Sequence, residues 1–256
     1  MIQTWGRTDT GLVRKENQDA YAIRENVSGG HTVCVVCDGM GGPAGGQMAS
    51  RIAVDTYLAE VEPLLRSEMS PTEIQKASEQ AVQRSNRAIR EAAAQDERYA
   101  YMGTTLVSAI SCPEGVVVTN VGDSRAYYYY QNRLLRITRD HSLVQNMVDR
   151  GDITPEEARR HPKRNLITRA LGPDEKVECD GFLCYLETGA NLLLCTDGLT
   201  NTVRDEEIQE AFHLQELEKI DMEGILDRLF QLALRQGAPD NVTAVLMRWA
   251  AEKEAS

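Results

Sequence analysis

Four apolar segments between residues 103 and 138 constrain the fold of this chain more than any other feature. GTTLVSAI, GVVVTNV, SRAYYYYQ and NRLLRIT follow one another with only short turns between them. Strands joined by short turns pair antiparallel, whereas parallel strands need a long crossover that is usually a helix. The stretch therefore predicts adjacent antiparallel strands and argues against the strand–helix alternation of a parallel sheet.

The rest of the sequence adds helices and further strands around this run. The clearest helix covers 70–95, where Ser70 and Glu73 form a capping box. A second capping box opens TPEEARRH (154–161), although the surrounding segment 142–172 is polar and irregular. Further helices are expected over 49–65 and 223–237, and further strands at HTVCVVCD (31–38), KVECDGFLCYL, ANLLLCTDG and NVTAVLMRW. No repeat or linker divides the chain, so the pattern predicts one α+β domain with antiparallel sheets.

Composition and charge exclude several classes of protein. No run of about 18 apolar residues is present, so no membrane span is expected. The N-terminus MIQTWGRTDTG lacks the layout of a signal peptide, which favours a cytoplasmic location. Acidic residues outnumber basic ones by 39 to 28, which argues against a non-specific nucleic-acid binder. The excess of carboxylates indicates either an acidic surface or a set of metal ligands.

The cysteines are predicted to be free thiols that fill the core. Most stand inside apolar runs, and their spacing is unlike the compact framework of a secreted protein. Cys34 and Cys37 form a C-x-x-C pair, but on a strand they point to opposite faces, without the knuckle or helix start of a zinc or redox motif. The six residues are Cys34, Cys37, Cys112, Cys179, Cys184 and Cys195.

The glycine-rich stretch after residue 38 resembles a nucleotide-binding loop only loosely. Gly39-x-Gly41-x-x-Ala44 follows a predicted strand, and Gly41 to Gly46 has the Walker A spacing. However, Gln47 and Met48 stand where Lys and Ser or Thr are required. Asp38 directly before the turn would also repel a pyrophosphate. Both nucleotide-binding interpretations are therefore disfavoured.

Five aspartates stand at the ends of predicted strands. All five could simply form turns, since Asp is a common turn residue. If they converge instead, oxygen ligands without His or Cys suit Mg²⁺ or Mn²⁺ better than zinc. The residues are Asp19, Asp38, Asp123, Asp197 and Asp240.

Eight sequence blocks in a fixed order resemble one known family. The chain is similar to the metal-dependent Ser/Thr protein phosphatases of the PPM (type 2C) family, in their compact bacterial form. The resemblance extends over nearly the whole chain. The blocks are TDTGLVRKENQDA (8–20), VCDGMGGPAGG (36–46), GTTL (103–106), NVGDSRAYY (120–128), ITRDHS (137–142), HPKRNLITRALG (161–172), LLLCTDGLTN (192–201) and APDNVTAVL (238–246).

The resemblance implies a fold and a division of the chain. Two antiparallel β-sheets are expected to pack as a sandwich, flanked by α-helices on both sides in an α-β-β-α arrangement. Residues 1–250 would form a single phosphatase domain, in which 142–172 is a flap near the active site. Residues 251–256 would be a short polar tail.

The resemblance also implies the residues of the active site. Asp38 would bridge two catalytic Mn²⁺ or Mg²⁺ ions, and Asp123 would join Asp197 in holding a third. Arg14 would bind the substrate phosphate with a planar fork that stays charged. A water bridging the two ions would attack the phosphorus, so no cysteine nucleophile is needed. The ligands of the two catalytic ions would be Asp19, Asp38, the backbone carbonyl of Gly39, Asp197 and Asp240.

Three residues depart from the family pattern without removing a direct ligand. Met40 stands where many members have a His proposed as general acid, and Pro43 stands where another His is common. Gln18 replaces a frequent acidic residue. His141 is expected to cap or pack beside a helix start, and His161 to belong to the flap. Protonation of the leaving group would then come from water or from a metal-bound water.

The expected function is metal-dependent hydrolysis of phosphoserine and phosphothreonine in proteins. Its partners would be phosphorylated proteins, including a Ser/Thr kinase and the substrates of that kinase. Neither nucleic acid nor membrane is expected, and the protein is expected to be a monomer. The alternative is a non-catalytic regulatory module on the same fold, which would be expected to lack some of the ligand aspartates.

Overall fold

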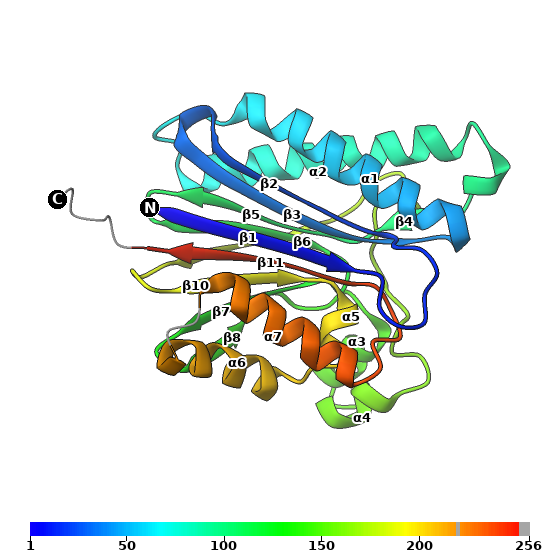
Figure 1. Ribbon diagram of the computed structural model, residues 1–256. Helices are drawn as coiled ribbons and strands as arrows, with labels where there is room; N and C mark the ends of the chain where they lie inside the picture. Colours follow the sequence, from blue (N-terminus) through cyan, green and yellow to red (C-terminus); the bar gives the residue numbers. More distant parts are fainter. Residues whose placement is uncertain (219–220, 251–256) are drawn as a thin grey trace.

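The computed structural model describes residues 1–218 and 221–250, and it forms a four-layered sandwich (Figure 1). Two antiparallel sheets face each other, and a pair of helices covers the outer face of each. This α-β-β-α arrangement confirms the expected fold class. The expected tail, 251–256, lies outside the described residues.

The first sheet carries the two long N-terminal helices. Its strand order is β2-β3-β5-β6-β9, with β4 paired to β3, and all pairs are antiparallel. The capping box of Ser70 and Glu73 is formed at the start of the second helix. The elements are β2 (Asp19–Val27), β3 (His31–Met40), α1 (Gly42–Val61), α2 (Pro71–Ala93), β4 (Gly103–Thr104), β5 (Leu106–Cys112), β6 (Gly115–Val121) and β9 (Asp180–Tyr185).

The second sheet joins the two ends of the chain and carries the C-terminal helices. Its strand order is β1-β11-β10-β7-β8, again antiparallel throughout. Asp221 caps the last helix by accepting a hydrogen bond from Gly224 N–H. The elements are β1 (Ile2–Asp9), β7 (Arg125–Tyr130), β8 (Arg133–Arg136), β10 (Asn191–Cys195), α6 (Asp205–Glu218), α7 (Met222–Arg235) and β11 (Val242–Trp249).

Three apolar cores fill the spaces between the four layers. One lies between the first sheet and α1 and α2, one between the second sheet and α6 and α7, and one between the sheets. Cys37 belongs to the first core and Cys34 to the core between the sheets, which confirms that they point to opposite faces of β3. All six cysteines are free thiols.

The expected run of adjacent strands proves to be divided between the two sheets. β5 and β6 pair in the first sheet, whereas β7 and β8 pair in the second. The chain changes sheets at Gly122, whose φ of 104° lies in the left-handed region that favours glycine. The strands themselves were predicted correctly, but the prediction of one continuous run was wrong.

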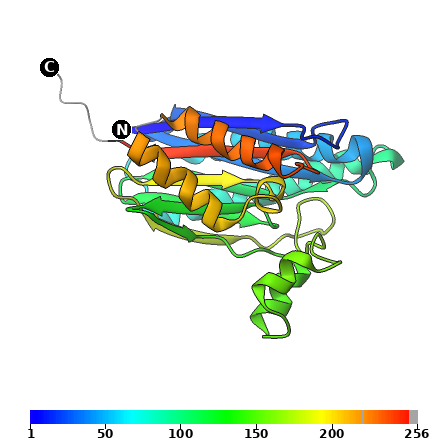
Figure 2. The ribbon, with the colours of Figure 1, turned by 60° about the horizontal axis from the view of Figure 1, so that its bottom comes forward.

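Several helices differ from the sequence expectation. Helix α1 begins at Gly42, inside the glycine-rich stretch and seven residues before the expected start at residue 49. Helices α5 (Asp197–Thr200) and α6 were not predicted. The segment 142–172 contains α3 (Leu143–Asp149) and α4 (Pro155–Arg160), of which α4 has the predicted Thr154–Glu157 capping box. Figure 2 shows α3 and α4 standing off the sandwich. The remaining helical turns are η1 (Ser28–Gly30), η2 (Glu62–Leu64) and η3 (Glu97–Tyr99).

None of the described helices combines the length and the apolar character that crossing a membrane requires.

Candidate active site

The five strand-end aspartates gather at one end of the sandwich. Asp19 begins β2 and lies directly opposite Asp38 in the β2–β3 ladder. Four of the five line a cavity of about 410 Å³, which lies where both sheets end. Arg14, Gln18, Gly39 and Met40 line the same cavity. The lining aspartates are Asp38, Asp123, Asp197 and Asp240.

Two glycines allow the backbone to close around this cavity. A Cβ on Gly39 would lie 2.0 Å from the carbonyl oxygen of Gly46, where β3 meets the first turn of α1. A Cβ on Gly198 would lie 1.8 Å from the carbonyl oxygen of Asn241, where α5 meets β11. Neither gap admits a side chain, so these glycines let the chain beside Asp38 approach α1 and the chain beside Asp197 approach β11.

Hydroxyl and amide groups that the sequence analysis did not single out fix the aspartates. Thr105 Oγ1 accepts a hydrogen bond from Asp38 N–H (3.0 Å), and Thr104 Oγ1 donates to Asp38 O (2.8 Å). Thr196 Oγ1 donates to Asp19 Oδ2 (2.9 Å). Asn241 Oδ1 accepts from Gln18 N–H (2.8 Å), so it ties β11 to the start of β2. The threonines lie in or next to the quoted blocks, but only the fold shows which aspartate each one holds.

Burial and mutual repulsion shape the charges of the buried aspartates. Burial raises the pKa of Asp19 to about 7, helped by the charges of Asp197 and Asp240. Burial, and then the charges of Asp19 and Asp197, raise the pKa of Asp38 well above its usual range. Burial likewise raises the pKa of Asp123 and Asp197. Such a cluster is poorly compatible with full ionisation unless positive charge enters it.

Two arginines supply positive charge to this cluster, since Arg125 acts on Asp123 and Asp197 and Arg14 lines the cavity itself. Arg14 is paired with Asp240. Its Nη2 donates to Asp240 Oδ2 at 2.7 Å, and this bond raises the pKa of the guanidinium further. The carboxyl groups of Asp38 and Asp197 also act on each other's pKa values. Over residues 1–218 and 221–250, no three Asp, Glu, His or Cys side chains are arranged so that they could hold a metal ion as they stand.

The donor chemistry fits hard divalent cations. All the candidate ligands are carboxylate or carbonyl oxygens, which Mg²⁺ and Mn²⁺ prefer. No histidine or cysteine of the described chain lines the cavity. Because the buried carboxylates raise each other's pKa values, divalent cations would relieve the repulsion that the protein alone leaves in place.

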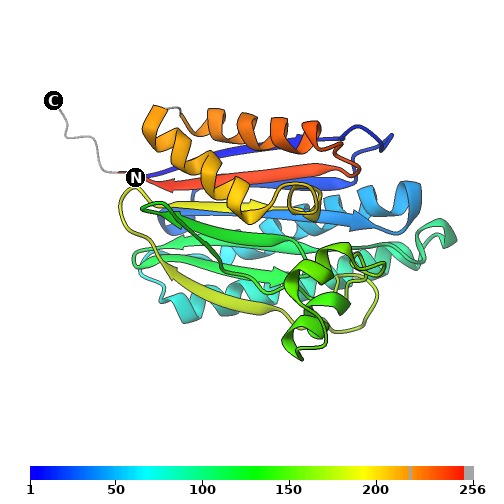
Figure 3. The same cartoon turned by 90° about the horizontal axis from the view of Figure 1, so that it is seen from below.

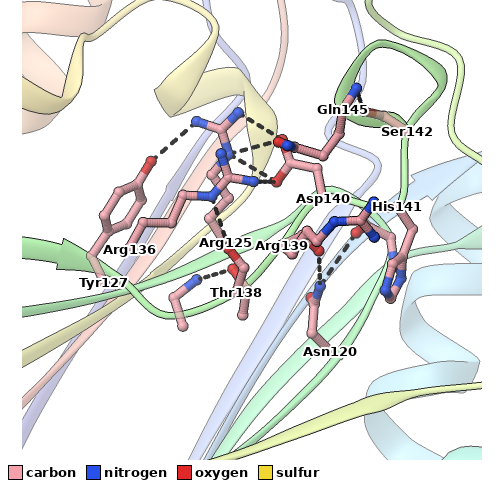
Figure 4. Close-up of polar contacts among 12 residues, drawn as sticks. Asn120, Arg125, Tyr127, Arg136, Thr138, Arg139, Asp140, His141, Ser142 and Gln145 are labelled. Carbon is pink, nitrogen blue, oxygen red and sulfur yellow. Dashed lines mark hydrogen bonds and ion pairs between the residues drawn. The ribbon is translucent and has the colours of Figure 1, made fainter. Parts of the chain in front are cut away.

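A second cavity, of about 320 Å³, lies beneath α3 and α4 and shares Asp123 and Asp197 with the first. Beside it, Arg125 Nη2 donates to Asp140 Oδ2 at 2.7 Å, and Arg136 pairs with the same carboxylate (Figure 4). This ion-pair cluster joins β7 and β8 to the segment that enters α3. It therefore fixes the turn that carries Asp123, a role that the sequence did not reveal.

Both histidines singled out from the sequence lie outside the cavity. His141 is buried, with Nδ1 accepting a hydrogen bond from Gly122 N–H (3.1 Å) and Nε2 facing Asp180 Oδ2 (3.2 Å). Arg169 Nη1 donates to Asp180 Oδ1 at 3.0 Å and holds that carboxylate in place. His141 thus connects β9 to the turn before Asp123, and Ser142 is the residue that caps α3. His161 Nδ1 accepts from Lys163 N–H within the segment 142–172.

His141 gives an expected pH dependence of stability. Burial lowers its pKa from 6.5, and the charges of Arg169 and Arg139 act in the same direction, while Asp180 opposes them. Because the unfolded state binds this proton more strongly, the free energy of unfolding should fall as the pH drops below 6.5. His141 should contribute no more than about 1.4 kcal/mol per pH unit. Urea unfolding at pH 7.5 and 5.5 should show a smaller decline for His141→Asn than for the wild type; equal declines would contradict the assignment.

Comparisons with known proteins agree on one family. The family model described as protein phosphatase 2C matches residues 13–247. Serine/threonine phosphatase stp of Listeria monocytogenes serotype 4b (strain F2365) is 38% identical over 245 residues, which cover 94% of this chain and 93% of that protein.

Solved structures give the same result. The crystal structure of serine/threonine phosphatase Stp1 from Staphylococcus aureus has a TM-score of 0.87 and 36% identity, and the match covers 99% of this chain and 96% of that one. The catalytic domain of the serine/threonine protein phosphatase PstP, solved in complex with two manganese ions, has a TM-score of 0.79 and 33% identity. That match covers 98% of this chain and 99% of the PstP chain.

Proposed function

The chain belongs to the protein phosphatase 2C family and is a metal-dependent protein-serine/threonine phosphatase, and we propose that its catalytic centre is the aspartate-lined cavity. Its substrates are proteins that carry phosphoserine or phosphothreonine, and its role is to oppose a Ser/Thr kinase. The observation that carries the proposal is the convergence of four buried or half-buried aspartates and Arg14 on one cavity.

The proposed metal centre uses the oxygen donors described above. Asp38 lies opposite Asp19 in the β2–β3 ladder, and the charges of both Asp19 and Asp197 raise its pKa, so it has a carboxylate neighbour on each side, which suits a bridging ligand. Asp123 and Asp197 also line the neighbouring cavity, which suits a third ion. When bound, two divalent cations neutralise a phosphate monoester and supply a nucleophilic water at neutral pH. The proposed ligands of the Mn²⁺ or Mg²⁺ pair are Asp19, Asp38, the carbonyl of Gly39, Asp197 and Asp240.

Arg14 is the proposed phosphate-binding group of the chain itself. Its guanidinium is held by Asp240 on the cavity wall and is half-exposed, so it can turn a planar pair of donors toward two phosphate oxygens. Met40 lines the cavity at the position after the Asp-Gly pair and carries no transferable proton. The proton for the leaving serine or threonine oxygen is therefore supplied by water.

Hydrolysis of p-nitrophenyl phosphate tests the proposed function. Turnover should require Mn²⁺ and should stop when EDTA is added, and Mn²⁺ should restore it. Isothermal titration should show Mn²⁺ binding to the EDTA-treated, dialysed protein, which separates an enzyme from a non-catalytic module on the same fold. Turnover that persists in EDTA would rule out the metal-dependent mechanism.

The proposal also extends to the organisation of the chain. Residues 1–250 act as a single domain and as a monomer, with 142–172 as a flap beside the active-site cavity. Asn165 and Ile167 from this segment line that cavity, and Ala158 and Arg159 line the neighbouring one. Sedimentation velocity of the full chain tests the monomeric state.

A further inference from the structure

Three exposed apolar side chains stand at the rim of the active-site cavity. Leu12 and Val13 are 64% and 68% exposed, and Leu166 is 50% exposed. Val13 directly precedes Arg14, and Leu166 lies between Asn165 and Ile167, all three of which line the cavity. Figure 3 places the β1–β2 connection (blue) and the segment 161–172 (yellow-green) at the same end of the sandwich. The cavity is therefore bordered by apolar groups from two separate segments.

The backbone that carries these side chains is held in place by hydrogen bonds. Leu12 N–H donates to Ala238 O at 3.0 Å, and Asn241 Nδ2 donates to the carbonyl oxygens of Thr10 and Glu16, both at 2.9 Å. On the other side, Leu166 O accepts from Leu143 N–H at 2.8 Å. Apolar groups on a fixed backbone lose little conformational entropy when a partner covers them.

The charges around the rim indicate which partner would cover it. Lys15, Lys163 and Arg164 are exposed in the same two segments and outnumber the exposed Glu16, although the whole chain has a net charge of −11. Basic groups around an active site attract phosphorylated, acidic chains and speed their association. Two copies of this chain that met rim to rim would place these basic groups against one another. An extended phosphopeptide is therefore the better occupant.

We propose that Leu12, Val13 and Leu166 form a docking rim that binds apolar side chains flanking the phosphorylated residue of the substrate protein. These three residues would determine specificity without taking part in the chemistry. The inference rests on the proposed phosphatase function and adds to it a class of substrate, in which leucine, valine or similar residues stand next to the phosphothreonine or phosphoserine.

Two phosphothreonine peptides of equal length and charge test the docking rim. One has Leu and Val beside the phosphothreonine, and the other has Ser at both positions. Wild-type protein with Mn²⁺ should hydrolyse the apolar peptide with about tenfold higher kcat/KM, mainly through KM, as expected for partial burial of apolar side chains. The double variant Leu12→Asn, Val13→Thr should lose most of this preference. Hydrolysis of p-nitrophenyl phosphate, which is too small to reach the rim, should not change.

Controls separate docking from other effects. Leu135→Asn alters another exposed leucine (58% exposed), which lies on β8 and does not line the cavity, and should keep the preference. Binding of both peptides, measured by fluorescence anisotropy in EDTA, tests docking even if the protein hydrolyses nothing. Equal kcat/KM values of the wild type for the two peptides would overturn the inference, and so would a double variant that keeps the wild-type preference. The inference would also fail if the wild type formed a dimer in sedimentation velocity and the double variant did not, because the rim would then be a dimer interface.

Discussion

Asp38→Asn is expected to abolish Mn²⁺-dependent hydrolysis of p-nitrophenyl phosphate while leaving the protein folded. Asp38 is half-buried beside Asp19 and Asp197, where both ions of the proposed catalytic pair need its carboxylate. Loss of outer partners of metal ligands already costs up to about 100-fold in activity, so loss of the bridging ligand itself should cost more. Steady-state turnover at saturating Mn²⁺ measures the effect.

The same substitution should stabilise the protein when metal is absent. Burial and the neighbouring carboxylates raise the pKa of Asp38, so the folded state holds a proton that the unfolded state releases. Stability in EDTA should therefore fall as the pH rises above the ordinary aspartate pKa of 3.8. Asparagine has nearly the same shape as aspartate and carries no charge. The free energy of unfolding of Asp38→Asn should therefore exceed that of the wild type by an amount that grows with pH and reaches at least about 1 kcal/mol at pH 8. Urea unfolding in EDTA at pH 6 and pH 8 measures it.

Asp140→Asn is the matched control, and its effect should have the opposite sign. Asp140 accepts hydrogen bonds from Arg125 and pairs with Arg136, and both Asp140 and the Arg125 side chain are largely buried (Figure 4). Its removal leaves a buried guanidinium without a counter-charge, which typically costs about 3–5 kcal/mol. If Asp38→Asn also destabilised the EDTA-treated protein, the cluster would not be the repulsive site inferred here. Residual Mn²⁺-dependent turnover near the wild-type rate would contradict its role as a ligand.

Local signals in the sequence predicted local structure well. The capping boxes of Ser70–Glu73 and Thr154–Glu157 were recognisable because each is complete within four residues, and both are formed in the structure. The tyrosine run shows the alternation expected of a strand, since Tyr127 and Tyr129 are buried and Tyr128 and Tyr130 are only partly so. Helix α6 was missed although its sequence carries helix signals, since Asp205, Glu206 and Glu207 form an acidic first turn and Ile208, Ala211 and Phe212 have the spacing of a buried helix face.

Long-range arrangement needed the structure. Nothing near Gly122 indicates that β7 pairs with β10, because that pairing depends on residues about 65 positions away. The aspartates could be recognised from the sequence because they stand at the ends of predicted strands and match family motifs. The distances between their side chains, however, depend on how the two sheets are stacked. The supporting groups, such as Thr196 for Asp19 and Asn241 for Gln18, connect residues 177 and 223 positions apart. Pairings of this length leave no pattern in a single sequence.

Arg14→Ala should lower kcat/KM for a phosphopeptide by about 100-fold, the range seen when one charged group that stabilises a transition state is removed. Arg14→Lys keeps the charge but loses the planar fork, so it should fall between the wild type and Arg14→Ala. Stability should change by no more than about 1 kcal/mol, because the ion pair with Asp240 is half-exposed. Arg98→Ala, which removes another exposed arginine paired with an aspartate, is the matched control and should leave turnover unchanged.

The metal affinity of Arg14→Ala distinguishes phosphate binding from an indirect effect on the metal centre. Arg14 donates to Asp240 Oδ2, one of the proposed ligand atoms, so its removal frees that carboxylate. Isothermal titration should therefore show Mn²⁺ binding that is as tight as in the wild type or tighter, while turnover at saturating Mn²⁺ stays low. Weaker Mn²⁺ binding, with turnover restored by excess Mn²⁺, would mean that Arg14 supports the metal ligands and does not bind the substrate phosphate.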